Sequence, residues 1–593
     1  MSNLRLFFIN DNKLRLGIMS SHTYYFAMDR DFRLINDRND LADFLGIDVK
    51  KLNYVLYVRG TESYYENFDI PKKNGGVRHI SAPTGYLRVI QKNLAGALMD
   101  YRVQLTESGA ISRSRSYAFE RKKWIYDNAI LHRGKRLVLN VDLCDYFDSF
   151  HFGRIVGFLK KNRNFQMNSN IAIVIANLCC YNGKLPQGAP TSPVLTNFIA
   201  SILDNDIIKL SKKYHLFYTR YADDLTFSTN DKQFANKFDD FLFDLENVIK
   251  TNGFSINTKK TRLEYKESRQ VVTGLVVNKK ANIRNDYYKT TRAMAYSLYR
   301  TGKFKIDNDE GTFNQLEGRL AYIYRLEQLK RNNCKESCKK LTAREIEYSK
   351  LLFYKSFVKN SRPLIITEGK TDNEYLKAAL KNLYKDYPTL IYKDEEGFHF
   401  KVELFKRSKK TERLFNLPID GADGITKMLH YFTECQNKPD YLNYFYKLGN
   451  IPKKPVILLF DNELDEKSKK PLRKFINSLD RVKLDKKRIS ENIIDKYYSY
   501  LLRNIFLLTT DLCKEHSENS EIEDLFLEYN NEPIINGKTF SRDDDAGKNG
   551  KYGKIVLAQY VSKNYNTLNF DGFRPLLDRI VKISKEYNDI KQK

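Results

Sequence analysis

The stretch that decides the fold is His215–Thr229, HLFYTRYADDLTFST, which holds two adjacent carboxylates within a segment rich in Tyr, Phe and Thr. Residues of these types favour strands, so the pattern predicts a β-hairpin with Asp223 and Asp224 at its turn. A second apolar strand is predicted over residues 137–142, and it ends on Asp142. A strand-end acid that faces a hairpin pair would bring three carboxylates to one site.

Three carboxylates at one point suit the transfer of a nucleotide onto a growing strand. That reaction uses two divalent cations about 4 Å apart, which stabilise the attacking and leaving oxygens. Magnesium prefers a few hard oxygen ligands and retains waters, so two or three Asp side chains suffice. A YADD tetrapeptide alone is a weak signal, because acidic pairs in turns are usually solvated. We predict that Asp142, Asp223 and Asp224 are the catalytic and metal-binding residues of a polymerase, with Mg²⁺ as cofactor.

A glycine-containing loop precedes the predicted hairpin. Residues 185–193 read LPQGAPTSP and lead into an apolar helical pattern from Val194. Such a loop lets the backbone approach a template base or an incoming nucleotide closely. Gln187 and Gly188 are therefore predicted to bind the nucleotide.

Cations on either side of the acids would hold a triphosphate. Lys260, in the stretch NTKKT at residues 257–261, offers a cation to the leaving group. Lys73 and Arg78 belong to PKKNGGVRHISAP at residues 71–83, a basic stretch that predicts a hairpin with its tip at Asn-Gly-Gly. These two cations would grip the triphosphate from the other side.

The order of these segments resembles the reverse transcriptase family over roughly residues 45–285. Its motifs A to D fall, in order, at Asp142, PQGAPTSP, YADD and Lys260. The resemblance implies an α+β right-hand polymerase, with fingers and palm in residues 1–285 and a helical thumb and linker in residues 286–360. It also implies that Phe147 screens against a ribose 2′-OH, with simple core packing as the alternative.

Two short motifs narrow the resemblance to retron reverse transcriptases: NAILH at residues 128–132, of the form NAxxH, and VTG at residues 272–274. Enzymes of that kind are expected to bind their own structured noncoding RNA and to use dNTPs. They prime from a 2′-OH of an internal guanosine and make a branched RNA–DNA product. RNA of this kind is recognised largely by shape, loops and phosphates. The candidate RNA-binding residues are Asn128, His132, Val272, Thr273, Gly274, Arg292 and Arg319.

Two acidic strand ends predict a second site in the C-terminal part. Glu368 follows the apolar run 363–367, and Asp372 comes four residues later. Asp461 and Glu463 follow the apolar run 455–460. In a parallel sheet the carboxyl ends of such strands share one edge. Four carboxylates there would form a second magnesium site, although each acid alone is an ordinary strand-end residue.

Together these acids resemble a Toprim domain over residues 361–593, an α/β fold with a parallel sheet. The Glu-Gly-Lys-Thr-Asp form is most similar to the overcoming-lysogenization-defect nucleases, but Asp-Asn-Glu replaces the usual Asp-x-Asp. The resemblance implies a glycine turn at residues 420–424 and a catalytic role for Lys554, for which a plain surface lysine is the alternative. By analogy the domain would be a nuclease effector in antiphage defence, restrained by the polymerase's product.

The composition favours a nucleic-acid partner. The formal charge is +28, and residues 361–593 hold 42 Lys and Arg against 36 Asp and Glu, which leaves 59 and 37 for residues 1–360. A generally Lys-rich proteome would spread the excess evenly, whereas here it gathers in the predicted polymerase. The sequence makes no prediction of the number of subunits.

We expect a cytoplasmic protein without a membrane span. The sequence contains no long apolar run, no signal peptide, and seven scattered cysteines that suit a reducing compartment. Cys334 and Cys338 have no second pair nearby and are interpreted as structural. Two alternatives stay open: a reverse transcriptase of another class with a non-catalytic nucleic-acid-binding C-terminal domain, and a scaffold without enzymatic activity.

Overall fold

The computed structural model divides the chain into two compact units, Met1–Arg284 and Asn285–Lys593. Several predicted residues lie outside the described ranges, namely Lys73, Cys334, Cys338 and residues 420–422. The structure describes residues 31–72, 75–111, 115–332, 340–418, 423–433, 440–464, 470–513, 519–542 and 550–592.

The first unit combines helices with two antiparallel β layers. Its helices and helical turns (η) are η2 (Phe32–Leu34), α2 (Arg38–Leu45), α3 (Val49–Asn53), η3 (Tyr54–Val58), η4 (Thr61–Tyr64), α4 (Gly85–Glu107), α5 (Ile125–Ala129), η5 (Ile130–His132), α6 (Phe152–Lys161), α7 (Ser169–Cys179), α8 (Ser192–Ile199), α9 (Ser201–Lys213), η6 (Lys232–Lys237) and α10 (Phe238–Thr251). Its strands are β1 (Tyr65–Pro71), β2 (Val77–Pro83), β3 (Leu137–Leu143), β4 (Phe217–Tyr221), β5 (Asp224–Thr229), β6 (Ile256–Tyr265), β7 (Val271–Val272) and β8 (Leu275–Val276).

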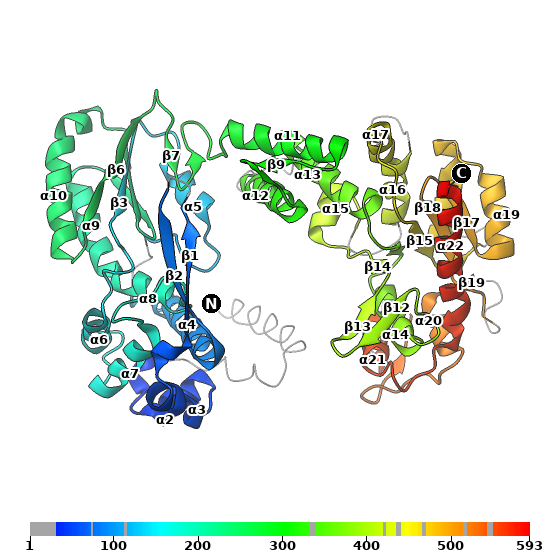
Figure 1. Cartoon of the computed structure of the whole chain (residues 1–593), viewed down its shortest axis with the longest axis horizontal. Coiled ribbons are helices and arrows are strands. Elements are labelled where there is room, and N and C mark those ends of the chain that lie inside the picture. The colour runs from blue at the N-terminus through cyan, green and yellow to red at the C-terminus, as the bar shows by residue number, and fades with distance from the viewer. Residues whose placement is uncertain are drawn as a thin grey trace. The chain divides into compact units, whose positions relative to one another are not determined.

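The central sheet of this unit has the order β4-β5-β3-β6, and all neighbouring strands are antiparallel. Strand β3 is buried along almost its whole length, because both faces of the sheet are covered. Helices α9 and α10 lie on one of these faces (Figure 1). The predicted strand at residues 137–142 and the predicted hairpin around YADD are both confirmed.

A separate hairpin, β1–β2, carries the predicted basic stretch. Its register runs from Tyr65 opposite Pro83 to Pro71 opposite Val77. Gly75 and Gly76 at the turn have φ of +85° and +79°, a conformation that glycine adopts without steric cost. The hairpin predicted over residues 71–83 is confirmed, with a first strand that begins earlier than expected.

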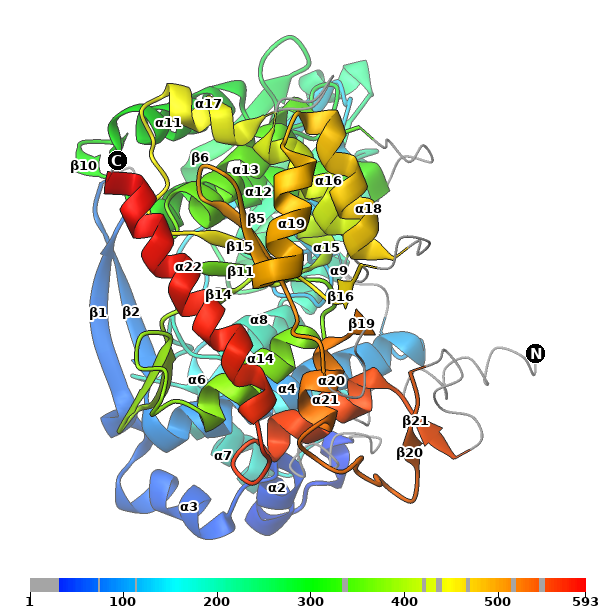
Figure 2. The same cartoon turned by 90° about the vertical axis from the view of Figure 1, so that its right-hand side faces the viewer.

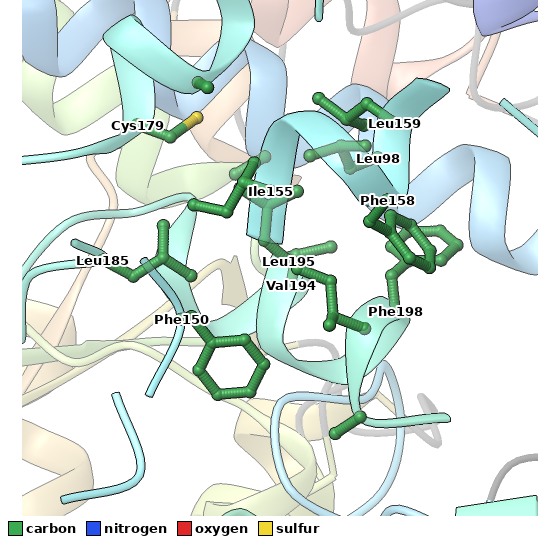
Figure 3. Close-up of a cluster of buried hydrophobic side chains, with 14 of the residues drawn as sticks. Leu98, Phe150, Ile155, Phe158, Leu159, Cys179, Leu185, Val194, Leu195 and Phe198 are labelled. Carbon is green, nitrogen blue, oxygen red and sulfur yellow. The ribbon is translucent and has the colours of Figure 1, made fainter. Parts of the chain in front are cut away.

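One apolar core joins the helices of the first unit to its sheet. Figure 3 shows the part where Ile155 and Phe158 of α6 lie against Leu195 and Phe198 of α8. All four side chains are at most 8% exposed. Because each buried side chain of this size contributes roughly 1.5–3 kcal/mol, the core anchors α8, which begins inside the PQGAPTSP motif at Ser192.

The second unit is an α/β structure with small accessory strands. Its helices and helical turns are α11 (Asn285–Thr301), α12 (Phe313–Asn332), α13 (Ala343–Phe353), η7 (Tyr354–Val358), α14 (Asp372–Asn382), α15 (Lys409–Phe415), α16 (Asp423–Phe432), α17 (Tyr441–Lys447), α18 (Pro471–Ser478), η8 (Leu479–Val482), α19 (Lys486–Lys496), α20 (Ile522–Leu527), α21 (Lys554–Lys563), η9 (Asp571–Phe573) and α22 (Arg574–Gln592). Its strands are β9 (Lys305–Ile306), β10 (Asp309–Glu310), β11 (Leu364–Thr367), β12 (Ile391–Asp394), β13 (Gly397–Phe400), β14 (Glu403–Leu404), β15 (Val456–Phe460), β16 (Asn462–Glu463), β17 (Tyr498–Leu502), β18 (Ile505–Thr509), β19 (Asn519–Ser520), β20 (Thr539–Phe540) and β21 (Lys551–Tyr552).

The main sheet of the second unit has the order β14-β11-β15-β18-β17. The first four strands are parallel and the edge strand β17 is antiparallel. Every residue of β15 is buried, as expected for a parallel strand covered on both faces. Alternate residues of the sheet pack against α14, α21 and the long helix α22, which Figure 2 shows lying across the strands.

The predicted thumb helices pack onto this α/β structure. Tyr299 of α11 contacts Phe445 of α17, with ring centroids 4.9 Å apart, and its carbonyl accepts a hydrogen bond from Asn450 Nδ2 (2.6 Å). Tyr354 also contacts Phe445. Residues 286–360, assigned by the sequence to a thumb and linker, thus share a compact unit with the rest of the C-terminal part. The functional division between them stays a prediction.

Within the described residues, none of the helices is both long and apolar enough to cross a membrane. Of the glycine turn predicted at residues 420–424, only the last two residues are described, and they begin α16.

Candidate active sites

The register of the central sheet brings Asp142, Asp223 and Asp224 together. Asp142 at the end of β3 lies opposite Asp224, the first residue of β5. In such an antiparallel pair the Cβ atoms are about 4.5–5.5 Å apart. The Leu143 amide donates to the Asp223 carbonyl (3.1 Å), which ties the acidic turn to the end of β3. The predicted convergence of the three acids is present, and their catalytic role stays a prediction.

The three carboxylates place negative charges close together at a site that is partly shielded from water. Burial raises the pKa of Asp223, and Asp142 raises it further, whereas Lys260 and Arg78 oppose the rise. Burial also raises the pKa of Asp224 to about 7, with added contributions from Asp223 and Asp142. Like charges held together in this way are stabilised by a cation.

Lys260 supplies part of that positive charge. Its Nζ lies 3.1 Å from Asp142 Oδ1 and 3.0 Å from Oδ2, and this bond raises the pKa of Lys260. Asn257 Nδ2 donates to Asp142 Oδ2 (3.1 Å). The sequence predicted a triphosphate contact for Lys260, but in this state its ammonium neutralises Asp142. Arg78 is exposed on β2.

A buried arginine binds the backbone of the acidic turn, and the sequence analysis did not predict this contact. Arg220 is fully buried and forms a bidentate ion pair with Asp204 of α9, with both N–O distances 2.8 Å. Its Nη1 donates to the Ala222 carbonyl (3.2 Å) and to the Tyr146 hydroxyl (3.0 Å). The sequence feature that could have predicted this ion pair is an arginine in the predicted strand directly before YADD, because a buried cation requires an anionic partner.

The PQG loop packs against the basic hairpin. The Ser81 amide of β2 donates to the Gln187 carbonyl (2.8 Å). Gly188 has φ of +126°, and a Cβ there would lie 2.7 Å from the Ser81 carbonyl oxygen. Only glycine fits this position. Phe147 is half-buried, and its ring lies 6.5 Å from that of Phe119 and 5.6 Å from that of Tyr146.

The NAxxH motif occupies the interior of the palm. His132 is fully buried and its ring nitrogens hydrogen-bond to Ser228 Oγ (2.8 Å) and Thr219 Oγ1 (2.7 Å). Burial lowers the pKa of His132 to about 3, so the imidazole is neutral. Asn128 is also fully buried. His132 therefore ties η5 to β4 and β5, and the RNA contact of these two residues stays a prediction.

The VTG motif is the turn of the small β7–β8 hairpin. Thr273 and Gly274 have φ of +46° and +83°, as a two-residue hairpin turn requires. Val272 is fully buried, and its predicted contact with RNA stays a prediction. Thr273 Oγ1 donates to the carbonyl of Ile125 (3.1 Å), the first residue of α5, so the VTG turn is bonded to the helix on which the NAxxH motif begins. Of the three VTG residues, only Gly274 is exposed.

Arg319 and Arg292, the cations predicted in the thumb, differ in the contacts that their guanidinium groups make. Arg319 Nε donates to Thr291 Oγ1 (3.0 Å), and its guanidinium lies 4.2 Å from the centre of the Tyr287 ring. Arg292 is exposed and lies 4.0 Å from a carboxylate oxygen of Glu347. Arg292 is therefore better able to reach a phosphate than Arg319.

Comparison with known proteins places the first unit in a family. Residues 70–280 match the family model of reverse transcriptases, described as RNA-dependent DNA polymerases. The chain is 32% identical over 281 residues to the retron Ec86 reverse transcriptase of Escherichia coli, a match that covers 47% of this chain and 83% of that protein. The chain belongs to the retron reverse transcriptases.

A second curated relative agrees with this assignment. The retron Mx162 reverse transcriptase of Myxococcus xanthus is 32% identical over 314 residues, which cover 48% of this chain and 62% of that protein. A solved structure of telomerase from Candida tropicalis matches at 14% identity and a TM-score of 0.29, with 65% of this chain and 64% of that chain covered. By its family, this retron reverse transcriptase is an RNA-directed DNA polymerase, as the sequence predicted for the first unit.

In the second unit of this retron reverse transcriptase, the predicted acids gather at the carboxyl edge of the parallel sheet. Glu368 follows β11 and Asp461 follows the neighbouring strand β15. The Gly369 amide donates to Asp372 Oδ2 (2.7 Å), and the Ile522 amide donates to Asp461 Oδ1 (3.0 Å). The structure therefore brings these acids from separate strands to one edge, as the sequence predicted.

Burial raises the pKa of three of these carboxylates. Burial raises the pKa of Glu368 to about 7, with Asp372 and Glu463 adding to the rise. Burial likewise raises the pKa of Asp372 and, together with Asp372 and Glu368, that of Asp461. Glu463 Oε1 is paired with Lys470 Nζ at 2.6 Å. The edge is a partly buried anionic site, in which Lys470 neutralises only part of the charge.

Two further acids belong to this site and were missed by sequence reasoning. Glu521 and Glu523, at the start of α20, bind the ammonium of Lys554 at 3.0 and 3.6 Å. Burial raises the pKa of Glu523 to about 7. For Lys554, these acids outweigh the effect of burial and raise its pKa. Glu521 and Glu523 have the same i, i+2 spacing as Asp461 and Glu463, and this spacing could have predicted that they belong to the site.

The donors fit a hard divalent cation in their chemistry. Among the described residues no three Asp, Glu, His or Cys side chains are already arranged to hold a metal ion. Glu368 Oε2 is nevertheless buried without a hydrogen-bond partner, and so is Glu523 Oε1. Carboxylate oxygens are the ligands that magnesium prefers. Like charges resist closer approach, so a bound cation would be needed to draw these groups together.

Proposed function

We propose that the first unit reverse-transcribes a cognate retron noncoding RNA from a 2′-OH primer into branched single-stranded DNA. The observation that carries this proposal is the convergence of Asp142, Asp223 and Asp224 in a chain that belongs to the retron family. The two signature motifs support the retron type, since His132 hydrogen-bonds to β5 of the acidic hairpin and Thr273 hydrogen-bonds to α5, the helix on which the NAxxH motif begins.

In this proposal Asp142, Asp223 and Asp224 would hold Mg²⁺, which when bound stabilises the charge that develops on the transferred phosphoryl group. Lys260 holds Asp142 in place and is positioned to exchange it for phosphate oxygens of a dNTP. Arg78 adds positive charge on the opposite side. The Gln187–Gly188 backbone, fixed by Ser81, forms a wall against which a base pair can lie.

The test isolates the nucleic acid made by the protein. Full-length protein is co-expressed with its RNA, the bound nucleic acid is treated with RNase, and small single-stranded DNA is analysed for a 2′–5′ branch. Wild-type protein and the exposed control Asp240→Asn yield branched DNA, whereas Asp223→Asn loses at least about three orders of magnitude of product. Unbranched DNA from the wild type would reject the retron mode of priming.

We propose further that the second unit is a Toprim-like, metal-dependent nuclease that acts as an antiphage effector. The support is the set of buried acids Glu368, Asp372, Asp461 and Glu463 at one sheet edge, where Glu368 retains an unpartnered oxygen. These residues would hold Mg²⁺, which supplies charge stabilisation to phosphodiester cleavage. Lys554 is then a cation beside the metal, anchored by Glu521 and Glu523.

Glu368→Gln separates the two activities. The variant is expected to keep DNA synthesis within about twofold of wild type and to lose effector toxicity, because one metal ligand is removed. The control Glu395→Gln lies on the exposed β12–β13 turn and should change neither activity. Loss of DNA synthesis in Glu368→Gln would show that the two sites do not act as separate modules.

A further inference from the structure

A second charged feature lies at the opposite end of the parallel sheet. A pocket of about 460 Å³ opens where the chain enters β11 and β15. The Leu364 amide donates to the Pro455 carbonyl (3.0 Å), so the two entry segments lie side by side. Glu368 lies five residues beyond Pro363 along extended chain, a span of about 17 Å from the pocket. The pocket is therefore distinct from the acidic edge.

The charged residues that line this pocket are all cations. They are Arg362, Lys401, Lys454 and Lys585. None of the four forms an ion pair with an acid among the described residues. Arg362 Nη1 donates to the Phe400 carbonyl (2.6 Å), and Lys401 Nζ donates to the Pro388 carbonyl (3.0 Å). Carbonyl groups orient these cations without neutralising them, so the pocket keeps a positive field.

The acid nearest along α22 does not offset this charge. Glu586 follows Lys585 in sequence, but it accepts a hydrogen bond from the Tyr498 hydroxyl (3.1 Å), away from the lining residues. Asp589, four residues after Lys585 on α22, and Glu403, whose amide donates to the Pro363 carbonyl (2.8 Å), form no ion pair with the lining cations among the described residues. Four cations around one hollow attract an anion of several charges. A terminal phosphate carries about −1.5 to −2 at neutral pH, which makes a polyphosphate the best match.

The rest of the lining suits the nucleoside part of such a ligand. Pro363, Leu390 and Val581 form an apolar wall, and Ser584 and Asn588 add polar groups from the same face of α22. The volume lies within the range of about 300–1,000 Å³ for small-molecule sites. A nucleic-acid backbone, by contrast, spreads its charge along an extended track.

We propose that this pocket binds a nucleoside triphosphate, as a site on the second unit separate from both acidic centres.

The test measures binding of ATP to the full-length protein by titration calorimetry in EDTA, where metal-dependent nucleotide binding at the polymerase site is suppressed. Lys454→Glu and Lys585→Glu are each expected to weaken binding by about tenfold, which corresponds to ~1.4 kcal/mol. The matched control is Lys582→Glu on the same helix. Lys582 lies over the Tyr498 ring and does not line the pocket, so its variant should bind ATP within about twofold of wild type.

Two competitors decide the class of ligand. ATP should displace a labelled ATP analogue at least about tenfold better than inorganic triphosphate, because the latter lacks a group for the apolar wall. A short single-stranded oligonucleotide without terminal phosphates should compete poorly. The proposal is overturned if the Lys454 and Lys585 variants bind ATP like wild type, if triphosphate competes as well as ATP, or if only the oligonucleotide binds in a Lys585-dependent way.

Discussion

Arg220 and Asp204 form a fully buried, bidentate ion pair beneath the acidic turn of the polymerase site, and the same guanidinium donates to the Ala222 carbonyl inside that turn. Ala222 has φ of +57°, a conformation that non-glycine residues seldom adopt. The ion pair therefore does more than neutralise a charge. It connects α9 to the backbone that orients Asp223.

Arg220→Met should destabilise the protein by about 3–5 kcal/mol, because it leaves Asp204 buried without a partner. The double variant Arg220→Met/Asp204→Leu should recover most of that stability, since both charges are gone. DNA synthesis should stay low in both, because neither restores the bond to Ala222. Denaturant unfolding and a primer-extension assay measure the two effects, with exposed Arg269→Met as control. Full activity in the double variant would show that the bond to Ala222 is dispensable.

Gly188→Ala should lower DNA synthesis more than it lowers stability. The new Cβ would lie 2.7 Å from the Ser81 carbonyl oxygen and 2.9 Å from Ile80 Cγ2, so the PQG loop must move away from the β1–β2 hairpin. We expect KM for dNTP to rise by about tenfold or more, because a shift of about 1 Å at a reacting site is costly. Gly183→Ala is the control, since its φ is also positive, at +72°, but nothing lies within 4 Å of its Cβ. Equal kinetics for both variants would contradict this role.

His132 should make the first unit less stable as the pH falls below about 6.5. Its folded-state pKa is lowered to about 3 by burial, so between these pH values the unfolded chain binds a proton that the folded chain excludes. This group alone changes the free energy of unfolding by up to ~1.4 kcal/mol per pH unit. In calorimetric scans from pH 7.5 to 4.5, His132→Gln should have a lower Tm at pH 7.5 and a flatter profile. The exposed control His215→Asn should follow the wild type, and parallel profiles for all three would exclude the effect.

Magnesium should stabilise the second unit through its acidic edge. Without metal, the burial of Glu368 and its repulsion by Asp372 and Glu463, which together raise its pKa, lower stability, so Glu368→Gln should unfold at a slightly higher temperature than wild type in EDTA. Binding stabilises the wild type by about 1.4 kcal/mol at a Mg²⁺ concentration ten times the Kd, and the variant should lose most of this gain. Thermal scans in an Asp223→Asn background remove the polymerase contribution. An unchanged Mg²⁺ response in Glu368→Gln would argue against a metal at this edge.

Much of the polymerase site could be predicted from the sequence, because its parts are local. The strand that ends at Asp142, the acidic hairpin and the glycine loop each depend on residues close along the chain. The buried contacts of His132 could not be predicted in the same way. A polar side chain has the same sequence signature whether it faces RNA or a buried strand, and only the packing of η5 on β4 and β5 distinguishes the two.

The sequence by itself determined the order of the motifs, the residues of both acidic clusters, and the membership of the first unit in a polymerase family. Only the tertiary structure decided which side chains complete each site. Arg220, Glu521 and Glu523 reach their partners through strand register and helix packing, which join residues far apart in the chain. The four-cation pocket exists for the same reason: its charges come from separate segments that meet only because β11, β15 and α22 pack together. Contacts of this kind depend on the whole fold, so no local pattern contains them.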